Sequence, residues 1–377
     1  MVPPPKPPEM KRIALNGRFT GSPQPTGTQK VAFHLFDQIL RRNREFEFVV
    51  FADSRFPGVA EWWDLPQTHL VEVPFQSWSK GHAHLWEQAE LPRLCLVNEC
   101  SVAHHPITTS PIWKSGCKSV VTLHDLNYHL HPKWYTASFR LAYALCATRG
   151  LRKAERVVAI SNYVFEQARD LLPIPVERLR MVYNGAIPLQ VKEPEEPPAN
   201  PYILCVGALP PHKNLVRLIK AYQLLRGEFD GLELHLVGRP HPRMSRNDRA
   251  LSRLLRSPGL TMLGYLSDSE LAQAYAGAAV YCMPSLEEGF GLPLLEAMSV
   301  GTPVVTSQAS CLPEVAGPSA VLVDPYKVEA IAAGLRQALR FTPAEKESRA
   351  AQGKAWASRF SWAATADAYL KIYAELF

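Results

Sequence analysis

The sequence predicts an α/β protein made of two doubly wound, parallel-sheet domains. Three observations support this fold class. The chain has 377 residues, which is too long for one ordinary hydrophobic core. Short β-branched runs alternate with amphipathic segments in both halves, and strands separated by helices form parallel sheets. Between the halves, residues 190–201 contain four prolines and no hydrophobic periodicity, as expected for a linker.

The first half contains strands at 12–16, 46–51, 119–123, 156–160 and 180–183, judged from β-branched runs that end in polar or glycine residues. Val31, Leu35 and Ile39 recur every four residues and predict a helix after the Pro/Gly loop at 23–28. Further helices are predicted at 137–153 and 163–172. Residues 56–93 are rich in Trp, Pro and His and show no clear period. The first domain is therefore predicted to cover residues 11–189.

The second half repeats the pattern, with strands at 202–206, 232–237, 260–266, 279–283, 303–306 and 320–323. Asn214 is a candidate helix cap, and Ser267 and Glu270 have capping-box spacing. Helices are also predicted at 328–339 and 362–377. The second domain is placed at 202–360. Because no strand follows residues 361–377, this last helix is expected to pack back on the first domain. Both halves are thus Rossmann-like.

The composition is typical of a soluble globular protein, with 47% hydrophobic and 20% charged residues. No apolar run approaches the roughly 18 residues of a membrane span. The N-terminal sequence MVPPPKPPEMKR has no signal core, which predicts a cytoplasmic protein with an extended tail at residues 1–10. The seven cysteines form no C-x-x-C pair and the histidines lack metal-site spacing, so neither a disulfide framework nor a metal is expected.

The net charge of +6 is carried by the first half of the chain. Residues 1–190 contain 22 Lys and Arg against 16 Asp and Glu, whereas residues 191–377 contain 19 of each. This asymmetry has two interpretations: an ordinary solvated surface, or a first domain that meets a phosphorylated substrate or a membrane surface. Nucleic acid is disfavoured, because no binding motif is present.

Residues 284–302, PSLEEGFGLPLLEAMSVGT, follow a buried strand, turn through glycines and enter a helix near Leu292. Free N–H groups and the helix dipole at such a turn bind anions. Glu296, inside the helix, is better placed to accept hydrogen bonds from sugar hydroxyls, and Glu288 lies at the turn. Phosphate and sugar recognition together indicate a nucleotide.

Other candidates also lie at strand ends, where doubly wound sheets bind ligands; in this fold the cleft between the two domains is the natural site. They are Asn16–Gly27, His124-Asp125, Ser161, Asn184-Gly185, Gly207–Asn214 and Gly238. Several have a purely structural interpretation as well. Lys213 alone suits a surface helix, Ser161 suits a helix N-cap, and His124 is either an acid/base, a hydroxyl ligand or a satisfied buried histidine. The chain lacks G-x-S-x-G, the P-loop motif and a G-x-G-x-x-G after its first strand, so hydride transfer with NAD and P-loop phosphoryl transfer lose support.

The run PSLEEGFGLPLLEAMSVGTPVV closely resembles the signature of retaining glycosyltransferases of family 4. Supporting motifs follow in the family's order from about Arg12: PTGTQKVA, VTLHDL, VAISNY, VYNG, VGALPPHKNL and LPEVAGPSAVLVDP. The resemblance implies the GT-B fold, in which two Rossmann-like domains face a cleft and a C-terminal helix returns to the first domain. It also implies a nucleotide-sugar donor bound mainly by the second domain.

The resemblance assigns roles to individual residues. Glu296 would accept from the ribose, Lys213 and the N–H groups at the helix start would hold the diphosphate, and Glu288 would contact the transferred sugar. In the first domain, Gly27 would approach the phosphates and His124 the donor sugar. The catalytic candidates are thus Glu288, His124 and Lys213. The remaining donor-side residues are Gly207, Asn214, Gly289, Phe290, Gly291 and Leu292, and the acceptor-side candidates are Asp125, Ser161 and Asn184.

One position departs from the family pattern. Many relatives carry an arginine near the Lys-Asn pair, whereas His212 precedes Lys213 here. The missing positive charge would then have to come from another arginine, Arg18 or Arg239. Lys213 and the N–H groups at the helix start would stabilise the leaving diphosphate, so neither a metal nor a cofactor is expected.

The expected function is a retaining hexosyltransferase that moves mannose from GDP-mannose to a glycan. The acceptor is expected to be linked to polyprenyl diphosphate, and the enzyme to be peripheral at the inner membrane face. Two other hypotheses remain open: a sugar-nucleotide epimerase of GT-B shape, and a non-catalytic nucleotide-sugar-binding subunit of a glycan assembly complex.

Overall fold

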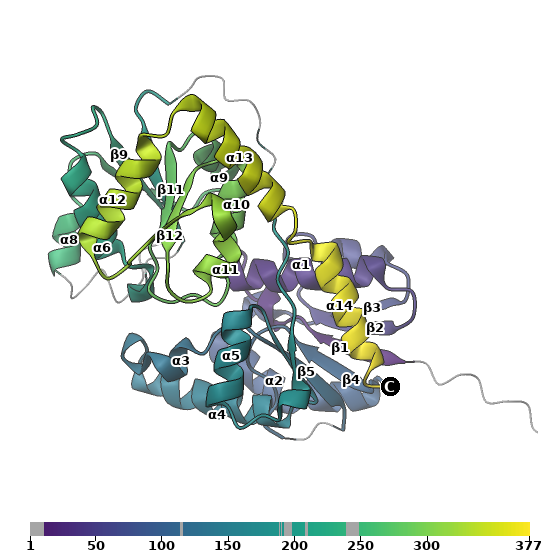
Figure 1. The fold of residues 1–377 in the computed structure, drawn as a ribbon. Coiled ribbons are helices and arrows are strands. Elements are labelled where there is room, and N and C mark those ends of the chain that lie inside the picture. The colour runs from purple at the N-terminus through teal and green to yellow at the C-terminus, as the bar shows by residue number, and fades with distance from the viewer. Residues whose placement is uncertain are drawn as a thin grey trace, which may run out of the picture. The chain divides into compact units, whose positions relative to one another are not determined.

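The computed structural model describes residues 11–113, 116–187, 189, 191, 198–207, 210–238 and 249–377. The chain divides into two compact units (Figure 1). The first unit runs to Gly185 and adds Ser361–Phe377, and the second unit comprises Ala186–Phe360. The predicted tail, 1–10, and much of the predicted linker, 190–201, lie outside the described residues.

The first unit is built on a seven-stranded parallel sheet in the order β3-β2-β1-β4-β5-β6-β7. Because every pairing is parallel, the carboxyl ends of all these strands lie at one edge. The chain reverses its direction of winding between β1 and β4, which is the switch point of a doubly wound sheet. The strands are β1 (Arg12–Asn16), β2 (Glu47–Ala52), β3 (Thr68–Glu72), β4 (Val102–His105), β5 (Lys118–Leu123), β6 (Arg156–Ala159) and β7 (Leu179–Met181).

The helices of the first unit include one from the far end of the chain. They are α1 (Gly27–Arg42), α2 (Lys80–Val97), α3 (Asn127–Leu130), α4 (Ala137–Lys153), α5 (Asn162–Leu171) and α14 (Trp362–Ala374). Helix α14 lies beside α1 (Figure 1). Tyr373 of α14 contacts buried His104 of β4, with Oη 2.6 Å from Nδ1, and Arg42 binds Asp367 through two bonds of 2.8 and 2.7 Å. The prediction that the last helix returns to the first domain is confirmed.

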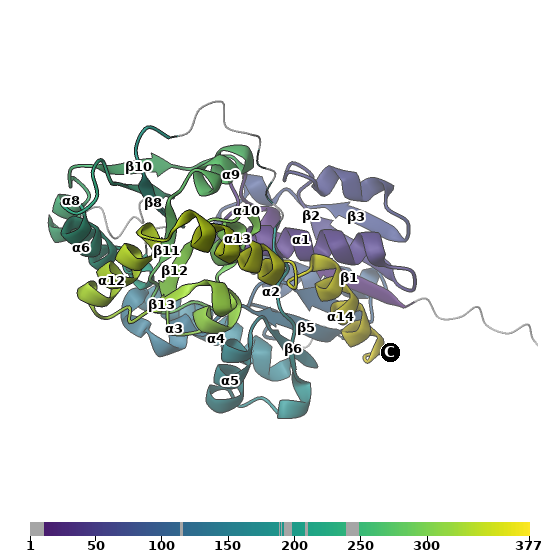
Figure 2. The same cartoon turned by 45° about the horizontal axis from the view of Figure 1, so that its top comes forward.

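The second unit contains a six-stranded parallel sheet in the order β10-β9-β8-β11-β12-β13. Its strands are β8 (Tyr202–Val206), β9 (Glu233–Val237), β10 (Leu260–Gly264), β11 (Val280–Met283), β12 (Val304–Ser307) and β13 (Val321–Val323). Its helices are α6 (Leu215–Leu225), α8 (Arg249–Leu254), α9 (Asp268–Ala276), α10 (Leu292–Val300), α11 (Leu312–Ala316), α12 (Val328–Leu339) and α13 (Pro343–Ala357). Both views show α13 beside α10 (Figures 1 and 2).

The two parallel sheets confirm the predicted fold class, and several element boundaries agree closely with the sequence pattern. Helices α4 and α12 have the predicted bounds. Strand β3, helix α2, strand β4 and helix α13 were not predicted. Helix α2 has Pro92 inside it and no continuous apolar face, and β4 is only four residues long. In the part of the chain that the structure describes, no helix is both long enough and apolar enough to cross a bilayer.

Candidate functional site

An ion pair between Lys213 and Glu288 lies at the centre of the candidate site in the second unit. Nζ of Lys213 is 2.7 Å from Oε1 of Glu288, and only 15% and 13% of the two side chains are exposed. Burial alone would raise the pKa of Glu288, but the charges of Lys213 and His212 outweigh it, so the net pKa is lowered. Glu288 is therefore a carboxylate at neutral pH.

Lys213 is positioned by the turn that joins β8 to α6. Gly207 has φ +135°, and a Cβ there would lie 3.3 Å from Cε of Lys213, so this glycine allows the lysine to cross close to the backbone. Asn214 occupies the N-cap position of α6 in the left-handed region, with φ 60°. Its side chain makes no cap bond. It donates instead to the carbonyl oxygens of Pro284 (2.9 Å) and Pro325 (2.7 Å). Asn214 therefore occupies the predicted cap position, but its side chain joins two strand-end loops instead of bonding the first turn of the helix.

The turn that carries Glu288 is held by residues that follow β12. The backbone N–H of Glu288 donates to Oγ of Ser310 at 3.2 Å. The thiol of Cys311 contacts the carbonyl oxygens of Glu288 and Phe290, both at 3.1 Å. Ser310 and Cys311 were not predicted as site residues. No local sequence signal identifies them, because only the parallel pairing of β11 with β12 brings them to this turn.

The start of helix α10 provides backbone donors beside this pair. Gly291 is the N-cap, with φ +101°, and a Cβ there would lie 2.9 Å from Leu312 Cδ2, so glycine is needed on both grounds. Pro293, within the first turn, has no N–H to satisfy. Among the described residues, no acceptor takes the N–H of Gly291 or Leu292. These two groups and the helix dipole form a place that stabilises an anion.

Glu296, on α10, is 8% exposed and accepts a hydrogen bond of 2.8 Å from Oη of Tyr275 on α9. Burial, and then the charge of Glu296, raise the pKa of Tyr275 well above its usual value, so the phenol stays protonated and donates. Tyr275 fixes the orientation of the carboxylate. Its role was not predicted, because α9 and α10 are distinct helices that meet only in the folded unit.

His124, in the first unit, follows β5 and is 8% exposed. Its Nε2 lies 2.7 Å from the carbonyl oxygen of Pro106. Since a carbonyl only accepts, Nε2 carries a proton and Nδ1 remains an acceptor. Burial lowers the pKa of His124 despite the opposing bond to Pro106, so the ring is neutral at pH 7. Of the roles left open by the sequence, a ligand for a hydroxyl group suits this state better than a general acid.

The other first-unit candidates have different environments. Asp125 accepts from the N–H of Asn127 at 2.9 Å. Ser161 is fully buried and caps α5, with Oγ 3.2 Å from the N of Val164, which is the structural role considered above. Asn184 is 3% exposed, and its Nδ2 is buried without a hydrogen-bond partner in the described part of the chain. A Cβ at Gly27, the first residue of α1, would meet nothing within 4 Å.

Arg18, one of the two candidates for a second phosphate-binding cation, is held within the first unit. Its Nε lies 3.1 Å from Oε1 of Glu87, and one Nη donates to Thr109 at 2.8 Å. Glu87, 1% exposed, also accepts from Asn16 (2.8 Å) and Thr109 (3.0 Å). Burial would raise the pKa of Glu87, but Arg18 and the other partners hold it well below its usual range. Arg239, the other candidate, lies outside the described residues.

The predicted residues therefore fall into two groups. Gly207, Lys213, Asn214, Glu288, Gly291 and Glu296 lie in the second unit, and Gly27, His124, Asp125, Ser161 and Asn184 lie in the first. None of the seven cysteines, all within the described ranges, forms a disulfide. Among the described residues no group of three His, Cys, Asp or Glu side chains is arranged to hold a metal.

Comparison with known families accounts for most of the chain. Residues 25–188 match the family model "Glycosyltransferase Family 4", and residues 187–356 match "Glycosyl transferases group 1". O-antigen chain mannosyltransferase B of Escherichia coli is 31% identical over 256 residues, which are 65% of this chain and 67% of that protein. The MMP α-(1→4)-mannosyltransferase of Mycolicibacterium hassiacum is 31% identical over 281 residues, or 72% of this chain and 64% of that protein.

Solved structures show the same fold. HepE of Anabaena, crystallised with UDP and glucose, aligns with a TM-score of 0.73 at 20% identity and covers 97% of this chain and 100% of that one. The similarity therefore extends through both units.

Proposed function

Because the chain belongs to glycosyltransferase family 4, we propose that it transfers mannose from GDP-mannose to a glycan acceptor with retention of anomeric configuration. The observation that carries the proposal is the Lys213–Glu288 ion pair beside the N–H groups of Gly291 and Leu292, which have no acceptor in the part of the chain that the structure describes. This combination offers a movable cation for phosphate, a carboxylate for hydroxyls and backbone donors for a second phosphate oxygen.

The chemistry follows from where charge develops. When the bond between the sugar and the diphosphate breaks, its electron pair goes to the diphosphate oxygen and the sugar carbon gains oxocarbenium character. Lys213 and the α10 N-terminus would stabilise the leaving group without a metal ion. As Lys213 turns from Glu288 to the phosphate, Glu288 would be released to accept from sugar hydroxyls. With Lys213 beside it the pKa of Glu288 is lowered, so Glu288 enters this exchange as a carboxylate.

Support for the donor comes from the names of the relatives, two of which are mannosyltransferases. A thermal-shift comparison of GDP-mannose with UDP-, dTDP- and ADP-sugars tests it. A ligand at a hundredfold its Kd stabilises a protein by about 2.7 kcal/mol. We expect the largest shift with GDP-mannose. A shift with UDP-glucose alone, the nucleotide class bound by HepE, would refute the donor while leaving the family chemistry intact.

The acceptor is proposed to be a polyprenyl-diphosphate-linked glycan at the inner membrane face. The relative from Escherichia coli acts, by its name, on an O-antigen chain, and the positive first half of this chain suits an anionic acceptor. Radiolabel from GDP-mannose should pass into lipid extract only when enzyme is present. Labelling of soluble glycans alone contradicts the lipid linkage. Donor turnover without any acceptor favours the epimerase, and NMR of the product reports whether the configuration is retained.

A further inference from the structure

The excess positive charge of this protein comes from one segment. Residues 100–154 contain seven basic residues and a single acid, Asp125, so 7 − 1 gives +6, which equals the net charge of the whole chain. The rest of the chain is therefore neutral overall. The basic residues are Lys114, Lys118, Lys133, Arg140, Arg149, Arg152 and Lys153. Such a concentration indicates an anionic partner for this part of the first unit.

Three of these charges gather at the end of helix α4. Arg149 and Arg152 are exposed and, within the described residues, form no ion pair with an acidic side chain. Leu145, 42% exposed, lies four residues before Arg149 and seven before Arg152, so the three share one face of the helix. Lys153 follows directly and is also exposed. This face is amphipathic rather than simply basic.

Trp113 projects beside this helix end and is 67% exposed. The preceding residue, Ile112, is held by two hydrogen bonds. Gln88 of α2 accepts from the N–H of Ile112 at 2.9 Å, and Nζ of Lys153 donates to the carbonyl of Ile112 at 2.5 Å. Because the backbone before Trp113 is anchored, less conformational entropy is lost at that position when the indole meets a partner.

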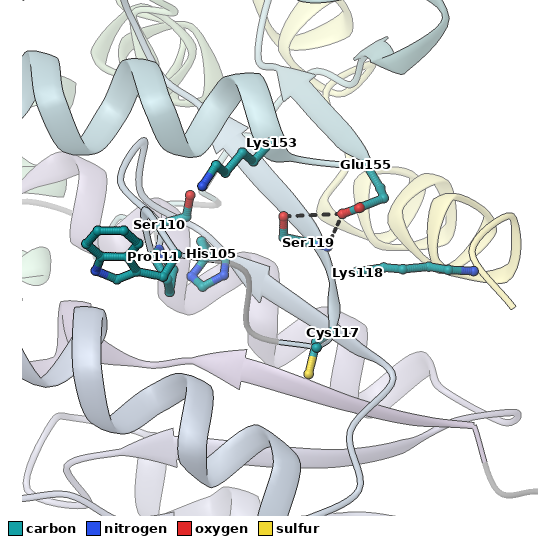
Figure 3. Close-up of a pocket in the computed structure, with 10 residues that line it drawn as sticks. His105, Ser110, Pro111, Cys117, Lys118, Ser119, Lys153 and Glu155 are labelled. Carbon is teal, nitrogen blue, oxygen red and sulfur yellow. Dashed lines mark hydrogen bonds between the residues drawn. The ribbon is translucent and has the colours of Figure 1, made fainter.

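Two cavities open at this place. The larger, about 590 Å³, is lined by Ile112, Trp113, Arg149, Arg152 and Lys153. The smaller, about 190 Å³, shares Trp113 and Lys153 and continues to Ser119 and Glu155 (Figure 3). Its only acid, Glu155, is engaged by the N–H of Ser119 at 2.6 Å.

One exposed aliphatic side chain, Leu96, lies against the wall of the smaller cavity, and exposed Val97 follows it in sequence. Leu96 and Val97, at the end of α2, are 60% and 67% exposed. Leu96 lies against Gly116, which lines the smaller cavity, because a Cβ at Gly116 would be 2.8 Å from Leu96 Cδ2. Apolar side chains, those of Trp113 and Leu96, therefore lie near the basic residues.

We propose that this surface docks on an anionic phospholipid bilayer. We call it the Trp113 surface, and it comprises Leu96, Val97, Trp113, Arg149, Arg152 and Lys153. Arginines attract anionic head groups, whereas an indole and exposed aliphatics gain by entering the interface. A purely phosphate-binding site would need the cations but not the exposed leucine, valine and tryptophan. The combination selects a bilayer over a soluble polyanion.

The Trp113 surface is separate from the candidate site residues of the first unit. Lys118 begins β5, and Lys153 shortly precedes β6, so the surface lies toward the amino ends of these strands. His124 and Ser161 follow the carboxyl ends of the same strands. The docking inference rests on the proposed function for its biological purpose. It adds to that function the surface that would bring the enzyme to a lipid-linked acceptor. Membrane binding itself requires no transfer.

Cosedimentation with vesicles, without donor, tests the inference. The wild type should bind vesicles that contain phosphatidylglycerol and not vesicles of phosphatidylcholine alone. Each basic residue near an anionic surface contributes roughly fivefold, so Arg149→Gln with Arg152→Gln should lower the partition coefficient roughly 30-fold. The control, Lys220→Gln with Lys346→Gln, removes two exposed lysines of the second unit and should change binding by less than about twofold.

A second pair of variants tests how much the exposed tryptophan contributes to vesicle binding. Trp113→Ala should weaken the binding that persists at about 0.5 M salt, where charge attraction is screened. Trp63→Ala, at another exposed tryptophan of the first unit (54%), should not. Brominated lipids should quench tryptophan fluorescence in the wild type more than in Trp113→Phe.

Two results would overturn the docking surface: equal binding by the arginine variant and its lysine control, or complete competition by soluble polyphosphate with no effect of Trp113→Ala. The second result would indicate a polyanion site. Circular dichroism confirms that each variant is folded. If no protein transfers sugar but the variants still differ in vesicle binding, the docking stands and the proposed function fails. If sugar passes to a soluble acceptor while all variants bind vesicles equally, the transfer stands and the docking fails.

Discussion

Each unit contains a buried ion pair near the carboxyl ends of its strands, and the two pairs differ in how they are completed. Arg18 and Glu87 lie 3.1 Å apart in the first unit, with 13% and 1% of their side chains exposed. Lys213 and Glu288 lie 2.7 Å apart in the second, with 15% and 13% exposed. Distance and burial alone would give both pairs the same role.

The two ion pairs differ in the groups that surround them. Asn16 and Thr109 complete the coordination of Glu87, and the fork of Arg18 is shared between Glu87 and Thr109. We call this network closed, because the charged atoms of both residues are hydrogen-bonded to protein groups. Lys213, by contrast, is a flexible point charge beside backbone N–H groups with no partner among the described residues. A closed network stabilises a fold, whereas an open pair can exchange partners with a ligand. The predictions below test this distinction.

The largest expected effect is acid lability of the first unit. Burial lowers the pKa of His104, His105 and His124, that of His105 to about 4. Below the ordinary pKa of about 6.5 the unfolded chain binds protons that the folded unit does not. The free energy of unfolding should therefore decrease as the pH is lowered below that value. The decrease is about 1.4 kcal/mol per pH unit for each histidine and stops when the pH reaches the pKa of that histidine in the folded unit.

Hydrogen exchange at pH 7 and pH 5 measures this effect, and amides of α1 should lose protection before those of α6. His105→Gln should reduce the pH slope, and His129→Gln, at an exposed histidine, should leave it unchanged. Earlier loss of protection in the second unit would contradict the assignment.

Breaking the closed network should mainly reduce stability. Arg18→Ala leaves Glu87 buried without its cation, and such a change costs about 3–5 kcal/mol. Urea unfolding of the first unit measures it. Arg42→Ala removes an exposed partner of Asp367 and should cost less than about 1 kcal/mol. If the two variants are equally stable, the Arg18–Glu87 network is not structural.

Breaking the open pair should mainly reduce catalysis. Lys213→Ala removes a donor to the leaving group and should lower the transfer rate about 10²- to 10³-fold. Loss of the cation lets the pKa of Glu288 rise, so the carboxylate can take up a proton and the folded unit survives. Initial rates together with thermal unfolding separate these effects, and Lys220→Ala on the exposed face of α6 is the control. A rate within tenfold of the wild type would remove Lys213 from the mechanism.

The smallest effect distinguishes two glycines, one from each unit. Gly207→Ala places a Cβ at φ +135°, 3.3 Å from Cε of Lys213. It should cost about 1–3 kcal/mol and weaken donor binding by displacing the lysine. Gly27→Ala fills open space and should stay within about 0.5 kcal/mol. Thermal unfolding compares the stability of both variants. Donor titrations followed by fluorescence compare Gly207→Ala with the wild type, and an unchanged affinity would show that the Gly207 turn does not position Lys213.

The fold could be predicted largely from local patterns. The apolar period of α12 lies within its own segment, so both of its bounds follow from the sequence, and the capping box of Ser267 and Glu270 marks the start of α9. Strand β4, with the sequence VAHH, could not be identified, because its two histidines are buried only through contacts made elsewhere in the fold. His104, for example, contacts Thr122 and Tyr373.

The site residues also fall into those that a local motif reveals and those that only tertiary contacts reveal. Glu288, Glu296 and Lys213 lie within recognisable motifs. Tyr275, Ser310 and Cys311 support them across a helix contact and a strand pairing that no local motif encodes. Glu87 lies in a segment without a readable period, and its partners Asn16, Arg18 and Thr109 come from two other parts of the chain.

Helix α14 sets an order of assembly during synthesis. Residues 186–360 leave the ribosome as a complete unit, whereas the first unit must wait for residues 361–377. Until Tyr373 and Tyr369 arrive, His104 and Thr122 lack the hydroxyl groups that they contact in the native state. The second unit, later in sequence, can therefore finish folding first. A nascent chain stalled before Ser361 would expose an unfinished first unit to chaperones and proteases beside a folded second one.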